Sequence, residues 1–317
     1  MPVAIITGAS KGLGRALAAA LAGRGWDLVV DARSAGPLEE AARELRGAGV
    51  RVVALPGDVA DGGHRAALVA AAGELGGLDL LVNNASVLGA EPLVRLADHP
   101  LDGLRAALEV NVVAPLGLIQ EGLPLLRISS YLPSYEEVTP YTGNAPYIGD
   151  VGNDATYDPH PYIENARNAG SSDSPLFAGI GDALIGAKGT SVGVSDATAG
   201  AAGRAIAGAG GAILNISSDA AVEAYPAWGG YGSAKAALDQ QSAVLAVEEP
   251  GLRVWWVDPG DMRTDLYAAA EPDEDPSGRP LPGTVVPGLL RLLDERAPSG
   301  RYRAAAGAAA PDGAGSR

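Results

Sequence analysis

The start of the chain combines a short apolar run, a glycine-rich turn and a helical segment, and this order constrains the fold more than any other feature. Val3–Ile6 is apolar throughout and predicts a buried strand, and residues 15–22 predict a helix. Between them, residues 7–14 have the sequence T-G-A-S-K-G-L-G. Glycines let a backbone approach phosphate groups closely, and a helix N-terminus supplies amide donors and the positive end of a dipole. The start of the chain therefore predicts a site for the pyrophosphate of a nucleotide.

The same alternation continues along the chain. Further apolar runs predict strands at residues 27–31, 51–55, 78–82, 212–217 and 252–257, with a last edge strand at residues 301–303. Helices are expected at residues 38–48, 63–75, 101–126, 229–247 and 289–295. Strands that alternate with helices are typical of an α/β fold. We therefore predict a Rossmann-type, doubly wound parallel β-sheet with helices on both faces and ligands at the carboxyl ends of the strands.

The most reactive pattern lies late in the chain, at Tyr231 and Lys235. Their spacing of four residues puts both side chains on one face of a helix. An ammonium group beside a phenol favours the phenolate, so we expect a lowered pKa for Tyr231 and proton transfer to or from a substrate oxygen. Ser218 ends an apolar strand, and its hydroxyl can hydrogen-bond the same oxygen. Taken alone, however, the Tyr231 and Lys235 spacing more often marks a surface pair on a helix.

Composition excludes several other functions. The 317 residues include no Cys, which excludes disulfides and thiolate metal sites. The three His residues lie far apart in sequence, so we expect surface histidines and no metal site. The net charge of −15 argues against nucleic acid or an anionic membrane as the main partner. Because a strand is predicted from Val3 on and no apolar run is long enough to span a bilayer, we expect a cytoplasmic protein.

Several short motifs together suggest a family. Residues 7–14 match T-G-x-x-x-G-x-G, and they are followed in order by Asp58-Val59, Asn83-Asn84-Ala85, Asn111, Ser218, Tyr231-x-x-x-Lys235 and Pro259-Gly260. With these motifs the chain resembles the single-domain short-chain dehydrogenase/reductases over about residues 2–127 and 201–304. The glycine spacing differs from the G-x-x-G-x-x-G of the extended, sugar-nucleotide-modifying subclass. Ser86 stands where the family usually has glycine, and we expect this difference to change little.

The resemblance implies catalytic roles for four residues. Tyr231 would be the acid and base, and Lys235 would tune its pKa and bind the cofactor ribose. Ser218 would bind the substrate oxygen; the neighbouring Ser217 competes for this role, but the family's spacing to the tyrosine favours Ser218. Asn111 would hold a water molecule in a proton relay, with an ordinary hydrogen-bonding role in its helix as the alternative.

The resemblance also implies a set of cofactor ligands. The glycine turn contributes Gly8, Ser10, Lys11, Gly12, Leu13 and Gly14. Asp58 and Val59 would contact the adenine, and Asn83 and Ala85 would line the cofactor. Further along, Pro259, Gly260 and Thr264 complete the set, with Thr264 on the nicotinamide carboxamide or, alternatively, as a helix cap.

The end of the second strand bears on cofactor choice. An acidic residue about 20 residues past the glycine turn is typical of NAD sites. Here that position falls on Ala32, the next residue is Arg33, and Lys11 lies within the glycine turn. Two cations suit a 2′-phosphate, so we predict NADP(H). Asp31 is the alternative: alternation along the strand should direct it to the other side, but a register error of one residue would bring it onto the ribose and favour NAD.

Residues 128–200 differ from the rest of the chain. They carry nine acidic and two basic side chains and few aliphatic residues, which is typical of irregular or disordered segments. We interpret them as an insertion into one Rossmann-fold domain formed by residues 1–127 and 201–304. An assembly or partner-binding role is favoured over a lid, because helix-to-strand connections lie opposite the ligand-binding edge of the sheet. Residues 305–317 are expected to be a frayed tail.

From the sequence we therefore expect an NADP(H)-dependent oxidoreductase that interconverts an alcohol and a ketone or aldehyde, as a homodimer or homotetramer. The alternative is a catalytically idle nucleotide-binding sensor or scaffold that uses the insertion as its interaction surface. The substrate stays open, because pocket walls vary freely within one mechanism.

Overall fold

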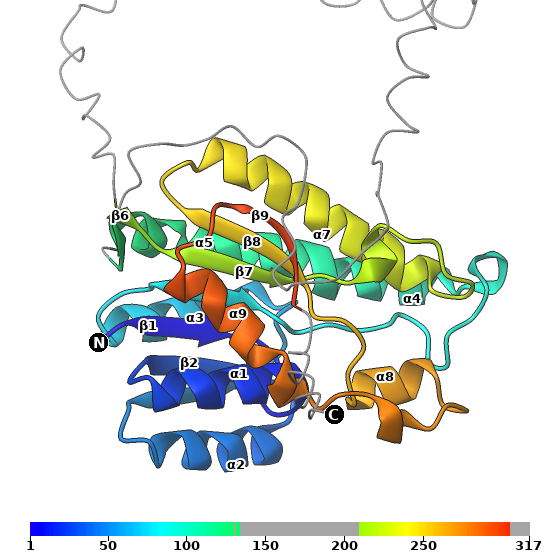
Figure 1. The fold of residues 1–317 in the computed structure, drawn as a ribbon, viewed down its shortest axis with the longest axis horizontal. Coiled ribbons are helices and arrows are strands. Elements are labelled where there is room, and N and C mark those ends of the chain that lie inside the picture. The colour runs from blue at the N-terminus through cyan, green and yellow to red at the C-terminus, as the bar shows by residue number, and fades with distance from the viewer. Residues whose placement is uncertain (130, 134–208, 305–317) are drawn as a thin grey trace, which may run out of the picture. The chain divides into compact units, whose positions relative to one another are not determined.

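Seven parallel strands form the central sheet of the computed structural model, which describes residues 1–129, 131–133 and 209–304 (Figure 1). In spatial order they are β3 (Val52–Pro56), β2 (Asp27–Ala32), β1 (Val3–Ile6), β4 (Leu80–Asn83), β7 (Ala212–Ile216), β8 (Arg253–Asp258) and β9 (Gly300–Arg303). All neighbouring pairs are parallel; in the middle, Ile5 pairs with Val29 on one side and Leu81 on the other. The predicted doubly wound parallel sheet is therefore confirmed.

Helices cover both faces of this sheet. One face packs against α1 (Gly12–Gly23), α2 (Ala35–Arg46) and α9 (Val286–Asp294), and the other against α3 (Gly62–Glu74), α5 (Ala114–Ile128) and α7 (Gly229–Glu248). Side chains alternate between the two cores: Leu28 and Val30 of β2 join the first, and Val29 joins the second. Because both faces are buried, the inner strands β1, β4 and β7 are nearly continuous apolar runs.

The long helix predicted at residues 101–126 is not continuous. It consists of α4 (Leu101–Leu108), a π-helical turn (Glu109–Val113) and α5. Asn111 lies in this turn with its side chain buried. The apolar pattern does not reveal the interruption, because a π turn changes the backbone without breaking the run of apolar residues. The other predicted strands and helices are present, with ends that differ by at most three residues.

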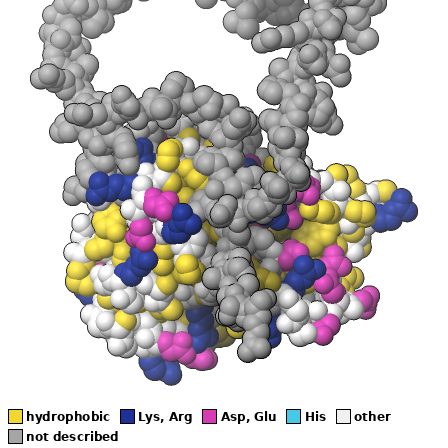
Figure 2. Space-filling view, viewed as in Figure 1, with side chains coloured by type: hydrophobic (Ala, Val, Ile, Leu, Met, Phe, Trp, Pro, Cys, Tyr) yellow, Lys and Arg dark blue, Asp and Glu magenta, His cyan; other side chains and the backbone are white. Residues whose placement is uncertain are grey.

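Shorter elements complete the described part of the chain. These are α8 (Asp265–Ala270) and 3₁₀ turns at Leu96–Asp98, Asp219–Ala221, Pro276–Gly278 and Pro282–Thr284. None of the helices in the described ranges is both long and apolar enough to cross a membrane. The cytoplasmic location expected from the sequence stays a prediction. On the face drawn in Figure 2, acidic and basic side chains are interspersed among apolar ones.

A small antiparallel ladder joins the described residues on either side of positions 134–208. β5 (Leu132–Pro133) pairs with β6 (Ala209–Gly210), and Leu132 lies opposite Gly210. Just before it, the ring of Tyr131 packs edge-on against Trp26, with centroids 4.7 Å apart. Most of the insertion predicted at residues 128–200, and the tail at 305–317, fall outside the described residues. Both therefore stay predictions.

Candidate active site

A cavity of about 560 Å³ opens at the carboxyl ends of the strands. It lies where the strand order reverses between β1 and β4, which is where open α/β sheets bind ligands. Most residues predicted from the sequence meet in its wall: Gly8, Ser10, Lys11, Gly12, Leu13, Arg33, Asp58, Val59, Ala85, Ser218, Tyr231, Lys235, Pro259, Gly260 and Thr264. Gly14, Asn83 and Asn111 do not line it.

The glycine turn needs its glycines for two different reasons. Gly8 and Gly12 have φ values of 66° and 59°, which are left-handed and disfavour side chains. At Gly14, a Cβ atom would lie only 2.5 Å from the carbonyl oxygen of Gly8 and from the side-chain nitrogen of Asn84. Gly14 thus acts through packing beneath the turn. The cradle stays narrow and open toward the cavity, as a pyrophosphate site requires.

Asn84, the first residue after β4, fastens this turn to the sheet. Asn84 Nδ2 donates to the carbonyl oxygens of Thr7 at 2.8 Å and Gly8 at 3.2 Å, and Thr7 Oγ1 accepts from the amides of Asn84 and Ala85. Asn83 was expected to line the cofactor, but its buried side chain donates to Asn215 Oδ1 within the sheet. The alternation of side chains along β4 explains this outcome: Asn84, one residue later, lines the cavity in its place.

Asp31 lines the cavity, but both of its carboxylate oxygens already have partners within the fold. One carboxylate oxygen accepts from the amide of Gly8 at 2.8 Å, and the other lies 3.1 Å from Nε2 of His64 on α3. The carboxylate is almost fully buried. The sequence gives no signal for this contact, because Asp31 and His64 lie 33 positions apart and meet only in the folded chain. The interpretation of His64 as exposed is therefore wrong.

The two cations that line the cavity beside the glycine turn and the end of β2 have different surroundings. Arg33 is exposed and has no hydrogen bond or ion pair with any residue that the structure describes. Lys11 donates to Asp265 at the start of α8 at 2.6 Å, and the two side chains are 68% and 74% exposed. Arg33 is therefore available to an anionic ligand at once, whereas Lys11 has to exchange partners.

Tyr231 and Lys235 lie in the first two turns of α7, and both are buried. Lys235 Nζ donates to the carbonyl oxygen of Ile216 at 2.7 Å and lies 5.5 Å from the centroid of the tyrosine ring. Burial lowers the pKa of Lys235 to about 8, although nearby Asp239 raises it.

The expected lowering of the tyrosine pKa is wrong. Burial raises the pKa of Tyr231, and a hydrogen bond with Ser86 offsets only part of this effect. The phenol is therefore protonated at neutral pH.

The two serines at the end of β7 have separate partners. Ser217 is buried, and its hydroxyl donates to Asp239 on α7. The Ser218 hydroxyl donates to Asp219 Oδ1 at 3.0 Å and accepts from the amide of Ala220 at 3.1 Å. Because the Ser217 hydroxyl is already committed inside the fold, Ser218 is the better candidate for a substrate oxygen.

Asn111 and Ser86 form a polar cluster that reaches Tyr231 through Ser86. Asn111 donates to the carbonyl oxygen of Val87 at 2.8 Å and accepts from its amide at 2.9 Å. Ser86 Oγ donates to Asn111 Oδ1 at 3.1 Å and also hydrogen-bonds Tyr231. Asn111 therefore positions the loop after β4, and its water-holding role stays a prediction. Ser86, expected to behave like glycine, is a contact of Tyr231 that sequence reasoning missed.

The segment after β8 forms the last wall of the cavity. Gly260 has a φ of 70°, and its amide donates to Asp258 Oδ1 at 2.8 Å. Thr264 lines the cavity and also caps α8, since its Oγ1 accepts from the amide of Tyr267 at 3.2 Å. Both interpretations of Thr264 are therefore compatible with its position.

Comparison with known proteins gives consistent matches. The sequence model of the short chain dehydrogenases matches residues 2–130 and 190–275. Cis-4-hydroxycyclohexanecarboxylate dehydrogenase of Sinomonas cyclohexanicum is 31% identical over 192 residues, which cover 56% of this chain and 76% of that enzyme. L-xylulose reductase of Bos taurus is 35% identical over 134 residues, or 40% of this chain, so the chain spans about half (52%) of that relative.

Solved structures share the fold. A short chain dehydrogenase of Escherichia coli CFT073, complexed with NADPH, superposes with a TM-score of 0.66 at 21% identity, covering 96% of both chains. At this identity the likeness bears on the fold alone.

Proposed function

Because the chain belongs to the short chain dehydrogenases, a family of oxidoreductases that act on CH–OH or C=O groups with NAD(P), we propose that it interconverts an alcohol and a ketone or aldehyde using NADP(H). One observation carries the proposal: Ser218, Tyr231 and Lys235 line the same cavity as the glycine turn and Arg33. A hydroxyl, a phenol and an amine at one end, with an anion site at the other, suit a dinucleotide and a small carbonyl compound.

The residues of the cavity fit this cofactor. A side chain is disfavoured at Gly8 by its positive φ and excluded at Gly14 by atoms 2.5 Å from the Cβ position, so the turn presents its backbone to the cavity. Ala32 cannot accept hydrogen bonds from a ribose diol, Asp31 is engaged by Gly8 and His64, and Arg33 is unpaired among the described residues. These three observations support a 2′-phosphate over a 2′-hydroxyl. Lys235 is proposed to bind the ribose as well.

The chain's own residues can then move the proton. When bound, the nicotinamide supplies or accepts the hydride. In the reducing direction Tyr231 gives its phenolic proton to the carbonyl oxygen, and in the oxidising direction it takes that proton back. Ser218 exchanges its bond to Asp219 for one to the substrate oxygen and polarises it. The raised pKa of Tyr231 keeps the phenol in the form that donates a proton.

The test is a panel of small ketones, aldehydes and alcohols, followed by the absorbance of the reduced nicotinamide, with wild type and Tyr231→Phe. We expect wild-type turnover with at least one compound. Tyr231→Phe should abolish turnover and leave the Kd of NADPH, measured by calorimetry, within a few-fold. Near wild-type kcat in Tyr231→Phe would refute the role of this residue. NADPH binding without any wild-type turnover would favour the idle sensor or scaffold instead.

The proposal includes a homodimer or homotetramer. On α7, the side chains of Val244 and Val247 are 43% and 71% exposed, and we propose that this helix face is covered in the assembly. Light scattering of the purified protein decides between a monomer and these assemblies.

A further inference from the structure

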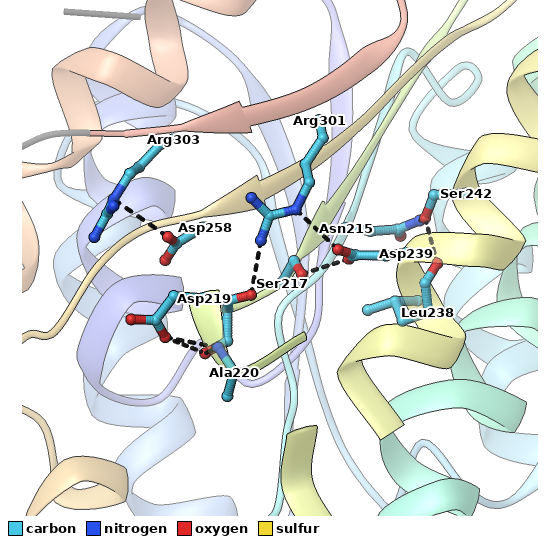
Figure 3. A network of polar contacts seen from close by, with 11 residues as sticks. Asn215, Ser217, Asp219, Ala220, Leu238, Asp239, Ser242, Asp258, Arg301 and Arg303 are labelled. Atoms are coloured by element: carbon cyan, nitrogen blue, oxygen red, sulfur yellow. Dashed lines mark hydrogen bonds and ion pairs between the residues drawn. The ribbon is translucent and has the colours of Figure 1, made fainter. Parts of the chain in front are cut away.

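The last strand of the described chain reaches the end of β7 through one side chain. Arg301 of β9 donates from Nε to Asp239 Oδ2 at 3.0 Å and from Nη2 to the carbonyl oxygen of Ser218 at 2.8 Å (Figure 3). The arginine is thus shared between helix α7 and the residue after β7. It lies outside the two segments, residues 2–130 and 190–275, that match the family.

Asp239 is the second part of this connection. It follows Lys235 by one turn of α7 and accepts from Ser217 on one side and from Arg301 on the other. Its side chain is only 11% exposed, and that of Arg301 is 20% exposed. A carboxylate so poorly hydrated depends on its hydrogen-bond partners, because few water molecules can replace them. The bonds of Asp239 to Ser217 and Arg301 are therefore better shielded from water than the exposed ion pairs on the surface.

Three consecutive residues at the end of β7 are held in this way. The carbonyl oxygen of Ile216 accepts from Lys235, the hydroxyl of Ser217 donates to Asp239, and the carbonyl oxygen of Ser218 accepts from Arg301. Two of the holding groups lie on α7, the helix that carries Tyr231, and the third bridges to it through Asp239. The backbone at Ser218 is thereby fixed relative to the tyrosine.

We propose that Arg301 and Asp239 are positioning residues that hold Ser218 in place relative to Tyr231 and Lys235. The inference rests on the proposed roles of these three residues. Its chemical reason is that a bound carbonyl group has to meet the serine hydroxyl and the phenol at once. A displacement of about 1 Å at such a site can lower the rate up to a hundredfold. The edge strand β9 is then part of the active-site geometry although it does not line the cavity.

The experiment compares Arg301→Gln, Arg301→Lys and Asp239→Asn with wild type. The matched control is Arg24→Gln, since Arg24 also makes two hydrogen bonds to a carboxylate of a distant element, Asp294, but away from the cavity. For each variant the folded fraction, the Kd of NADPH, kcat and KM are measured. Amide hydrogen exchange of the peptide that contains residues 216–220 is followed as well.

We expect Arg301→Gln and Asp239→Asn to lower kcat at least tenfold with the Kd of NADPH within about threefold, and to speed exchange in that peptide. Arg301→Lys keeps the positive charge on a single donor nitrogen and should recover part of the lost kcat. Arg24→Gln should leave kcat, the Kd of NADPH and the exchange rate of that peptide unchanged. If Arg301→Gln does not fold, Asp239→Asn and Arg301→Lys carry the same comparison.

Unchanged exchange at residues 216–220 in folded Arg301→Gln, Arg301→Lys and Asp239→Asn would overturn the inference. A kcat within twofold of wild type in these variants would overturn it as well. Failure of the proposed function looks different, because wild type itself then shows no turnover. In that case the exchange measurement still decides whether Arg301 and Asp239 hold the backbone at Ser218.

Discussion

Replacing Arg33 by alanine tests the choice of cofactor most directly. Arg33 has no partner among the described residues, so the variant breaks no contact there and its whole effect comes from the ligand. A hydrogen bond between charged groups contributes about 1.5–3 kcal/mol, and about 1.4 kcal/mol corresponds to a tenfold change in affinity. Because Arg33 is exposed, we expect the lower end, a loss of about tenfold in kcat/KM for NADPH.

Lys11→Ala provides the comparison, since Lys11 is already paired with Asp265. Binding a phosphate would cost it that ion pair, and exposed pairs contribute only about 0–1 kcal/mol. The net gain from Lys11 is thus slightly smaller than from Arg33, and we expect a loss of about three- to tenfold for NADPH.

The assay is kcat/KM with NADPH and with NADH for wild type and both variants, at low and at high ionic strength. Arg43→Ala is a matched control, because Arg43 is exposed on the neighbouring helix α2 but does not line the cavity. Values for NADH should be nearly unchanged in all variants. A wild-type preference for NADH, or equal losses with both cofactors in Arg33→Ala, would show that the 2′-phosphate assignment is wrong.

Two further predictions concern the fold. In wild type, burial would raise the pKa of Asp27, but its bonds with Arg51 outweigh this effect and leave the pKa below the ordinary value of 3.8. The pair therefore stabilises the fold above pH 3.8, and this contribution is lost as the pH falls through the folded-state pKa. Arg51→Ala should therefore lower the free energy of unfolding by about 1–3 kcal/mol at pH 7, with a difference from wild type that shrinks toward and below pH 3.8; a constant difference in denaturant titrations would contradict this explanation. Replacing residues 134–208 by a short Gly/Ser linker should leave a soluble protein with nearly the same Kd for NADPH by calorimetry, because β5 and β6 already pair the flanking residues. Insoluble expression would show instead that this segment is integral to the fold, and a change confined to light scattering would support a role in assembly.

The strands and the glycine turn were predictable because their signals are local. A strand buried on both faces is apolar throughout, as Val3–Ile6 is, and Tyr231 and Lys235 are related by one turn of helix. The contacts that complete the candidate site are not local. Arg301 meets Ser218 from 83 positions away, and His64 meets Asp31 from 33 positions away. Such pairings leave no periodic pattern in a single sequence.

Electrostatics were also beyond local reasoning. The spacing of Tyr231 and Lys235 indicates a charge pair, but the direction of the tyrosine pKa depends on how deeply both groups are buried. Burial is a property of the assembled fold, to which β7, α7 and the loop after β4 all contribute. The same holds for Ser86, whose importance comes from the neighbours the fold gives it.

The β5–β6 ladder has a consequence for how such a chain can change over time. It lies at the amino end of β7, whereas the cavity lies at the carboxyl end, so one strand length of about 17 Å separates them. A loop whose ends are already joined costs only about 0.6 kcal/mol for each doubling of its length. On the sequence prediction that residues 134–208 belong to an insertion, we therefore expect insertions and deletions there to be nearly neutral for the stability of the host domain. Selection can therefore lengthen, shorten or replace this segment while the opposite end of the sheet keeps its chemistry.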